Sequence, residues 1–124
     1  MLIDEKIYAR LALKADDVYP IEAPNGFAVP CVVYNILTET PVRDISEDAH
    51  MASFVTLQVD VYGLDTVEVL KLGRVIRRDF LNWADDDVTV LTNDDQKRFL
   101  DNTTDVDLFR MMLIFKLYVR DDEA

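Results

Sequence analysis

The segment FVTLQVDVYGLD, residues 54–65, continues after one threonine into VEVLKLGRVIRRDFL, residues 67–81. Apolar and polar side chains alternate over 54–62, which is typical of a β-strand with one buried face. Gly63 closes this strand, and Asp65 with Glu68 opens an amphipathic helix whose basic residues lie toward its end, where they favour the helix dipole. The apolar stripe of this helix contains Val69, Leu72, Gly73, Ile76, Phe80 and Trp83. The two segments together predict a helix that packs on a sheet.

Three segments before this unit predict further elements. Residues 2–14 place Ile3, Ile7 and Leu11 four residues apart, which predicts an amphipathic helix of about three turns. A turn-rich connection follows, with room for a short extended piece at 18–21. The run CVVYNILT, residues 31–38, predicts a strand antiparallel to 54–62 that Pro41 ends or bends. A long acidic loop over 38–54 is expected between these two strands, and long loops tend to be functional.

Two more strands are expected after the second helix. Residues 88–92 follow an Asp85-Asp86-Asp87 turn and predict a short strand, Asn93-Asp94-Asp95 predicts another turn, and 96–104 is ambiguous. Residues 106–120 alternate so regularly that they predict a central or near-central strand. Its buried face would contain Phe109, Met111, Leu113, Phe115, Leu117 and Val119. Its other face, which includes Met112, Ile114 and Tyr118, is more apolar than a solvated surface requires.

The elements together predict an α+β fold with a mostly antiparallel four- to five-stranded sheet and two α-helices packed on it, in the order α-β-β-β-α-β-β. The length of 124 residues is typical of one domain. Because no repeat, low-complexity segment or linker divides the chain, residues 1–124 are expected to form a single domain with a short charged tail at 121–124.

The charge balance excludes several functions. The chain carries 24 acidic and 13 basic residues, for a net charge of −11. Binding to nucleic acid or to anionic membranes depends on Lys and Arg, so neither is expected.

The one cysteine, Cys31, lies in an apolar run and predicts a buried thiol in a protein made in the reducing cytoplasm. We expect a soluble protein with no cleavable signal peptide and no membrane span.

Residues typical of catalytic and ligand-binding sites are sparse. His50 lies beside Glu47 and Asp48, but a solvated loop residue is a simpler interpretation than a catalytic one. The acidic clusters 85–87 and 93–95 offer oxygen ligands for Ca²⁺ or Mg²⁺, yet they lack the EF-hand spacing, and turn formation explains them more simply. The glycines are too far apart for a phosphate loop, and one cysteine with one histidine gives no zinc pattern. We therefore expect no catalytic residue, no metal site, no cofactor and no enzymatic activity.

The charge is unevenly distributed along the chain. Residues 1–63 hold ten acids and four bases, residues 64–83 hold three acids and four bases, and residues 84–124 hold eleven acids and five bases. The second predicted helix is therefore the only element that is not acidic, and Lys71, Arg74 and Arg78 lie opposite its apolar stripe. One interpretation is a solvated face that complements the helix dipole. The other is a contact with an acidic surface of an identical neighbour, as a head-to-tail ring requires.

The middle of the chain also carries a family pattern. It has VPCVVYNILTETP at 29–41, which supplies a proline, an apolar strand with a tyrosine and a Thr-x-x-Pro end. A Gln-x-Asp-x-aromatic strand follows, and then a helix that ends in arginines before an apolar residue. The matching residues are Pro30, Tyr34, Thr38, Pro41, Gln58, Asp60, Tyr62, Arg77, Arg78 and Leu81. Over roughly residues 2–120 the sequence resembles the tail terminator, or tail completion, proteins of tailed bacteriophages.

This resemblance implies an α+β subunit of the virion tail-neck junction. Such subunits assemble as a hexameric ring on the tail tube, end its polymerisation and join it to the head-neck connector, while DNA passes through the lumen. The implied partners are further copies of the chain, the tail tube protein and the connector protein. An acidic lumen would repel DNA phosphates and so let DNA pass.

Candidate contacts follow from this resemblance together with the charge pattern. Lys71, Arg74 and Arg78 are candidates for the subunit interface. The loop over 38–54 supplies candidates that line the lumen or reach the neighbouring ring, namely Glu39, Arg43, Asp44, Glu47 and Asp48. Two alternatives stay open, which are another neck or head-closure adaptor and a small metal-dependent enzyme that uses the acidic turns and His50.

Overall fold

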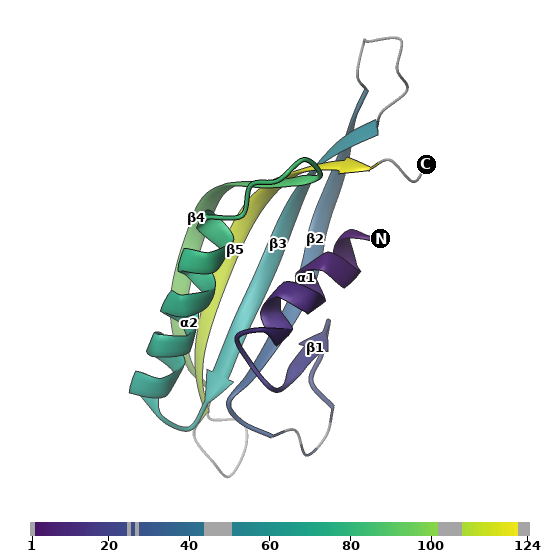
Figure 1. Cartoon of the computed structure of the whole chain (residues 1–124). Coiled ribbons are helices and arrows are strands. Elements are labelled where there is room, and N and C mark those ends of the chain that lie inside the picture. Colours follow the sequence, from purple (N-terminus) through teal and green to yellow (C-terminus); the bar gives the residue numbers. More distant parts are fainter. Residues whose placement is uncertain (1, 25, 27, 44–50, 102–107, 122–124) are drawn as a thin grey trace.

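The computed structural model of the chain describes residues 2–24, 26, 28–43, 51–101 and 108–121 (Figure 1). Two helices, α1 (Ile3–Ala12) and α2 (Thr66–Leu81), accompany one five-stranded sheet. Its strands are β1 (Val18–Pro20), β2 (Cys31–Arg43), β3 (Met51–Gly63), β4 (Val88–Asp101) and β5 (Leu108–Asp121). The predicted α+β class is confirmed.

The sheet is mixed rather than purely antiparallel. β1 pairs in parallel with β2, whereas β2 with β3, β3 with β5, and β5 with β4 are antiparallel. The order across the sheet is β1-β2-β3-β5-β4, so it differs from the order along the chain. The predicted central position of the last strand is confirmed, because β5 lies between β3 and β4.

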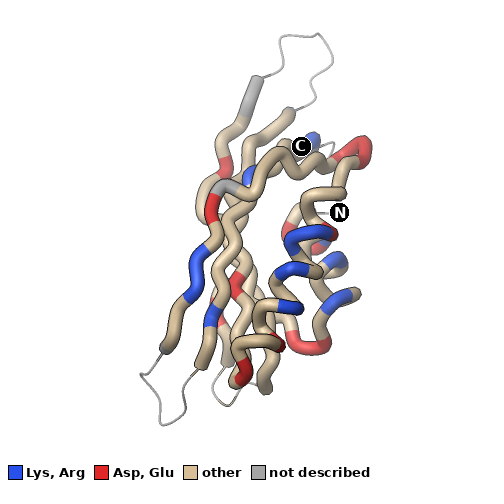
Figure 2. Tube along the Cα trace, turned by 90° about the vertical axis from the view of Figure 1, so that its left-hand side faces the viewer, with Lys and Arg blue, Asp and Glu red and all other residues tan. Residues whose placement is uncertain are grey.

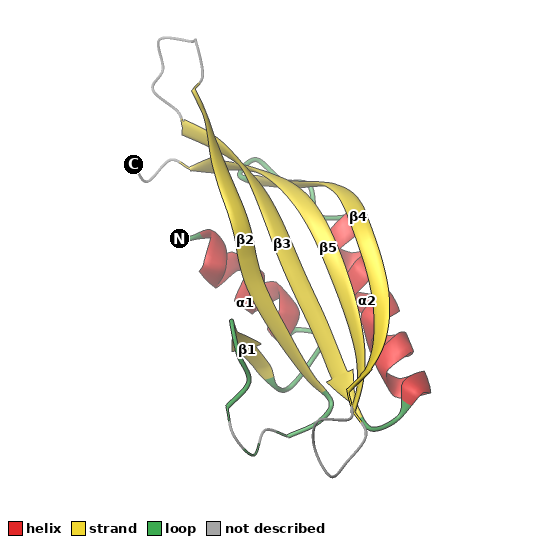
Figure 3. Cartoon of the chain, turned by 180° about the vertical axis from the view of Figure 1, so that it is seen from behind, coloured by secondary structure: helices red, strands yellow, loops and turns green. Residues whose placement is uncertain are grey.

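Both helices cover the same face of the sheet, and among the described residues no helix covers the other (Figures 1 and 3). The alternate side chains of β3 and β5 that point to the helices are buried. They are Val55, Leu57, Val59 and Val61 in β3 and Met111, Leu113, Phe115, Leu117 and Val119 in β5. Ile7 and Leu11 of α1 and Ile76 and Phe80 of α2 complete this core. Burial of these alternating residues against two amphipathic helices is the main term that stabilises the fold.

The predicted bounds of the long loop, 38–54, are wrong at both ends, and residues 44–50 lie outside the described residues. β2 continues through Pro41 to Arg43, and β3 already begins at Met51. β1 pairs with only three residues of β2, Val32 to Tyr34, so the rest of β2 has an open edge on that side. A proline is tolerated at such an edge because its missing N–H removes no hydrogen bond between strands.

The turn predicted at Asn93-Asp94-Asp95 is also wrong, because β4 runs without interruption from Val88 to Asp101. Two register shifts against β5, after Val90 and after Asn93, accommodate the turn-forming residues as bulges. The side-chain amide of Asn93 donates to the carbonyl oxygens of Asp95 and Ile114, at 2.9 and 3.0 Å. Pairing with the long β5 therefore overrides the local turn preference.

The start and the packing of α2 follow the predicted pattern. The Asp65 carboxylate caps the helix by accepting a hydrogen bond from the backbone N–H of Val67 at 3.0 Å. Val69, Gly73, Ile76 and Phe80 form its buried face. The side chain of Met111 in β5 occupies the space that a Cβ at position 73 would need.

Gly73→Ala should therefore destabilise the protein although alanine is the better helix former. The propensity gain is about 1 kcal/mol, whereas overpacking a core costs about 1–3 kcal/mol. We expect the melting temperature, followed by circular dichroism, to fall by several degrees. Combining Gly73→Ala with Met111→Val should recover stability relative to Met111→Val alone, and a single variant that melts above the wild type would contradict this packing.

Candidate interaction surfaces

The outer face of α2 carries the three predicted cations. Lys71, Arg74 and Arg78 are exposed, and within the described residues no hydrogen bond or ion pair holds their side chains. Arg77 differs, because its Nε donates to Oδ1 of Asn93 in β4 at 2.9 Å. We call Lys71, Arg74 and Arg78 the α2 stripe, and Figure 2 shows cationic segments along the layer that the two helices form. The charge of the stripe is available to a partner.

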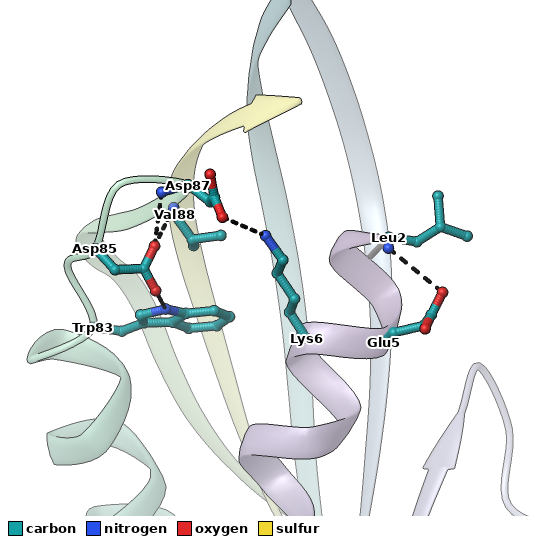
Figure 4. Close-up of polar contacts among 7 residues, drawn as sticks. All are labelled: Leu2, Glu5, Lys6, Trp83, Asp85, Asp87 and Val88. Carbon is teal, nitrogen blue, oxygen red and sulfur yellow. Dashed lines mark hydrogen bonds and ion pairs between the residues drawn. The ribbon is translucent and has the colours of Figure 1, made fainter. Parts of the chain in front are cut away.

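The cations of α1, in contrast, bind within the molecule. The Nε of Arg10 donates to Oδ2 of Asp79 in α2 at 2.8 Å, and its guanidinium lies 4.7 Å from the centre of the Trp83 ring. The Nζ of Lys6 lies 3.2 Å from Oδ2 of Asp87 (Figure 4). These contacts hold α1 against α2 and against the turn that follows α2.

That turn contains the acidic cluster 85–87, and its first carboxylate is occupied locally. Asp85 accepts hydrogen bonds from Nε1 of Trp83 at 3.0 Å and from the backbone N–H groups of Asp87 and Val88 at 2.8 Å each (Figure 4). Partial burial raises the pKa of Asp85, but these hydrogen bonds and the charge of Lys6 lower it more, so the pKa lies below its usual value. In the part of the chain that the structure describes, no three His, Cys, Asp or Glu side chains are grouped as metal ligands.

Asp85→Ala should lower the free energy of unfolding by about 1 kcal/mol at pH 7, because three donors lose their acceptor at a partly exposed site. A depressed pKa in the folded protein means that the carboxylate stabilises the fold above its unfolded-state pKa. This contribution is lost as the pH falls through the folded-state value. Urea unfolding at pH 7, 5 and 3 should therefore show the gap between wild type and variant closing toward pH 3. An equal gap at all three pH values would contradict the assignment.

The opposite side of α1 forms an acidic hollow. Asp4, Glu5, Tyr8 and Tyr34 line a depression of about 380 Å³ between α1 and β2. Tyr8 is 46% exposed, and its ring centre lies 6.5 Å from that of Tyr34. A second, smaller depression also has Asp4 in its lining and adds Glu39 of β2. We call the surface around Asp4, Glu5, Tyr8 and Glu39 the α1 hollow.

Of the predicted loop candidates, Glu39 and Arg43 lie in strand β2 rather than in a loop. Glu39 lies in the paired part of β2, opposite Val55 of β3, and the backbone of Arg43 pairs with Met51 at the end of the same strand. Asp44, Glu47 and Asp48 lie outside the described residues, as does His50. The structure therefore brings Glu39 to Asp4 and separates both from the α2 stripe.

The face of the sheet away from the helices holds a polar centre that the sequence did not reveal. Asp60 in β3 is 5% exposed, and it accepts hydrogen bonds from Nε of Arg110 in β5 at 3.0 Å and from Nε2 of Gln58 at 2.7 Å. The guanidinium of Arg110 lies 5.7 Å from the ring centre of Tyr62 and 5.2 Å from that of Phe99. Arginine, tyrosine and phenylalanine are enriched in protein interfaces, so this face has an interface-like composition.

The thiol of Cys31 is buried, as predicted. Burial, with a smaller contribution from the negative charge of Asp17, raises the pKa of this thiol to about 11. The thiol is therefore protonated at neutral pH and is a poor nucleophile.

Comparison with known proteins identifies the fold. No protein-family model and no curated protein matches the sequence. Among solved structures, a chain of the virion of a native gene transfer agent (GTA) particle has the same fold. It superposes with a TM-score of 0.56 at 14% sequence identity, covering 93% of this chain and 92% of that chain. The two chains therefore share an α+β architecture along almost their whole lengths.

Neither α1 nor α2 is long and apolar enough to cross a bilayer.

Proposed function

We propose that this chain is a structural protein of a virion, located at the tail-neck junction and made in the host cytoplasm. It assembles as a hexameric ring that caps the tail tube, ends its polymerisation and joins it to the connector. In this role the protein works through its surfaces rather than through a catalytic site.

The observation that carries the proposal is the fold shared with a chain of the GTA virion over 93% of the sequence. The resemblance of the sequence to tail terminator proteins points to the same class of particle. The surfaces agree with such a role, because the chain has a cationic stripe on α2, an acidic hollow at α1 and a sheet face with an interface-like centre.

A head-to-tail ring requires two different surfaces that complement one another on each copy. The α2 stripe supplies one of them. The net charge of −11 favours an acidic lumen, which would repel the phosphates of DNA and so let the duplex pass without binding.

Size-exclusion chromatography with light scattering tests the ring. We expect the purified chain to form a six-copy species, either alone or once tail tube protein is added, and electron microscopy of that species should show closed rings. A strict monomer at high concentration that stays monomeric with tail tube protein would contradict the proposal.

A further inference from the structure

We propose that the α2 stripe of one copy binds the α1 hollow of the next copy. This inference rests on the proposed ring and names the two surfaces that form its subunit contact.

The donor surface is preorganised on a regular helix. Lys71, Arg74 and Arg78 span about 10 Å along α2, at a rise of about 1.5 Å per residue. Their side chains are exposed and, in the described part of the chain, have no acidic partner. Three cations on one helix face with no intramolecular partner leave charge that a neighbour can neutralise.

The acceptor surface carries Asp4 and Glu5 beside the exposed ring of Tyr8, and Glu39 in a second depression that Asp4 also lines. Within the described residues, Asp4 and Glu39 have no ion pair, and Glu5 accepts only a long hydrogen bond of 3.5 Å from the N–H of Leu2. Lys6 and Arg120 also line the smaller depression, but Lys6 is engaged by Asp87. The ring of Tyr8 offers a face on which an arginine side chain can stack.

The other described acids are less suitable as acceptors. Some already bind within the molecule, namely Asp60, Asp65, Asp79, Asp85, Asp87 and Asp95. Asp16, Asp17 and Glu68 line the same depression as Lys71 and therefore lie on the donor side. Glu22 is a single exposed acid, and exposed Asp86 lies between Asp85 and Asp87, which already bind within the molecule. Among the acids whose side chains the structure describes, the α1 hollow is the remaining place where three carboxylates without an ion pair gather.

The positions of the two surfaces determine the kind of assembly. α2 lies on the β4 side of the sheet and α1 on the β2 side (Figure 1). A contact between them joins two different surfaces, so each added copy presents a free stripe at one end and a free hollow at the other. Such a heterologous contact builds a ring when the rotation between successive copies closes.

Two charge-reversed proteins test the contact. One carries Lys71→Glu, Arg74→Glu and Arg78→Glu, and the other carries Asp4→Lys, Glu5→Lys and Glu39→Lys. Alone, each should need at least about tenfold more protein for half-assembly than the wild type, because all three ion pairs become repulsive. An equimolar mixture should restore rings in which the two variants alternate, which native mass spectrometry can count.

The outcomes separate this inference from the proposed ring. If the wild type forms rings and the Asp4/Glu5/Glu39 variant alone forms them equally well, the pairing is overturned. The pairing is also overturned if the mixture of the two variants stays dissociated. Neither result contradicts the proposed ring. A wild type that forms no ring even with tail tube protein would overturn the ring itself. If circular dichroism shows that the Asp4/Glu5/Glu39 variant does not fold, a protein with Asp4→Asn, Glu5→Gln and Glu39→Gln takes its place. Assembly of that protein at the wild-type concentration would overturn the pairing.

Discussion

The chain with Lys71→Glu, Arg74→Glu and Arg78→Glu should stay folded and form no rings at the protein concentration at which the wild type assembles. All three side chains are exposed on α2 and glutamate is a good helix former, so the melting temperature should change by only a few degrees. Glutamate at position 78, in the last turn, opposes the helix dipole, at a cost of about 0.3–1 kcal/mol. Assembly should be lost because three attractive pairs per interface become repulsive. Light scattering and circular dichroism on the same sample measure both effects.

A matched variant controls for net charge. Each Lys or Arg to Glu change subtracts two charges, so three changes take the chain from −11 to −17. Lys97→Glu, Arg98→Glu and Lys116→Glu make the same change at exposed residues of β4 and β5, outside both the α2 stripe and the α1 hollow. This control should assemble more readily than the stripe variant. Equal loss of assembly in both would assign the effect to general repulsion and contradict a role for the stripe.

Arg110→Ala should lower the free energy of unfolding by about 2–4 kcal/mol. The change leaves the carboxylate of Asp60, which is almost fully buried, without its cationic partner, and breaking a buried pair from one side costs about 3–5 kcal/mol. The range is discounted because the Arg110 side chain is partly exposed. Urea unfolding followed by fluorescence of Trp83 measures it.

A change of Asp60, the partner of Arg110, tests whether the unpaired carboxylate causes this loss of stability. Combining Arg110→Ala with Asp60→Asn removes the unpaired charge and should recover much of the loss. Lys116→Ala, at an exposed position of the same strand, should change stability by less than about 0.5 kcal/mol. If the double variant is no more stable than Arg110→Ala, the buried carboxylate is not the source of the loss.

Periodicity predicted the long elements because burial follows it directly. The alternation in β3 and β5 and the 3.6-residue stripe of α2 each face one core, so pattern and structure coincide. The incorrect predictions concern Pro41 and Asn93 to Asp95, because these residue types on their own favour the end of a strand or a turn. An open edge at β2 and two bulges in β4 accommodate these residues, and neither depends on local sequence.

The interaction surfaces were only partly predictable. The α2 stripe lies on one helix, so helical spacing predicted its exposure. The Asp60 and Arg110 pair joins residues fifty positions apart, and it depends on the register of β3 against β5. Glu39 and Asp4 line one depression for a similar reason, since α1 must first pack beside β2. Contacts between segments that are distant in the sequence depend on the topology of the fold, and the spacing of residues along the sequence does not predict that topology.

Tail length in particles assembled without this chain tests the proposed function most directly. Deleting its gene and measuring tubes by electron microscopy should show overlong tubes of variable length, and supplying the wild-type chain should restore one length. The stripe-reversed chain should fail to restore it. Tubes of normal, uniform length that are detached from heads would contradict a role in ending polymerisation and would assign the chain to head closure instead.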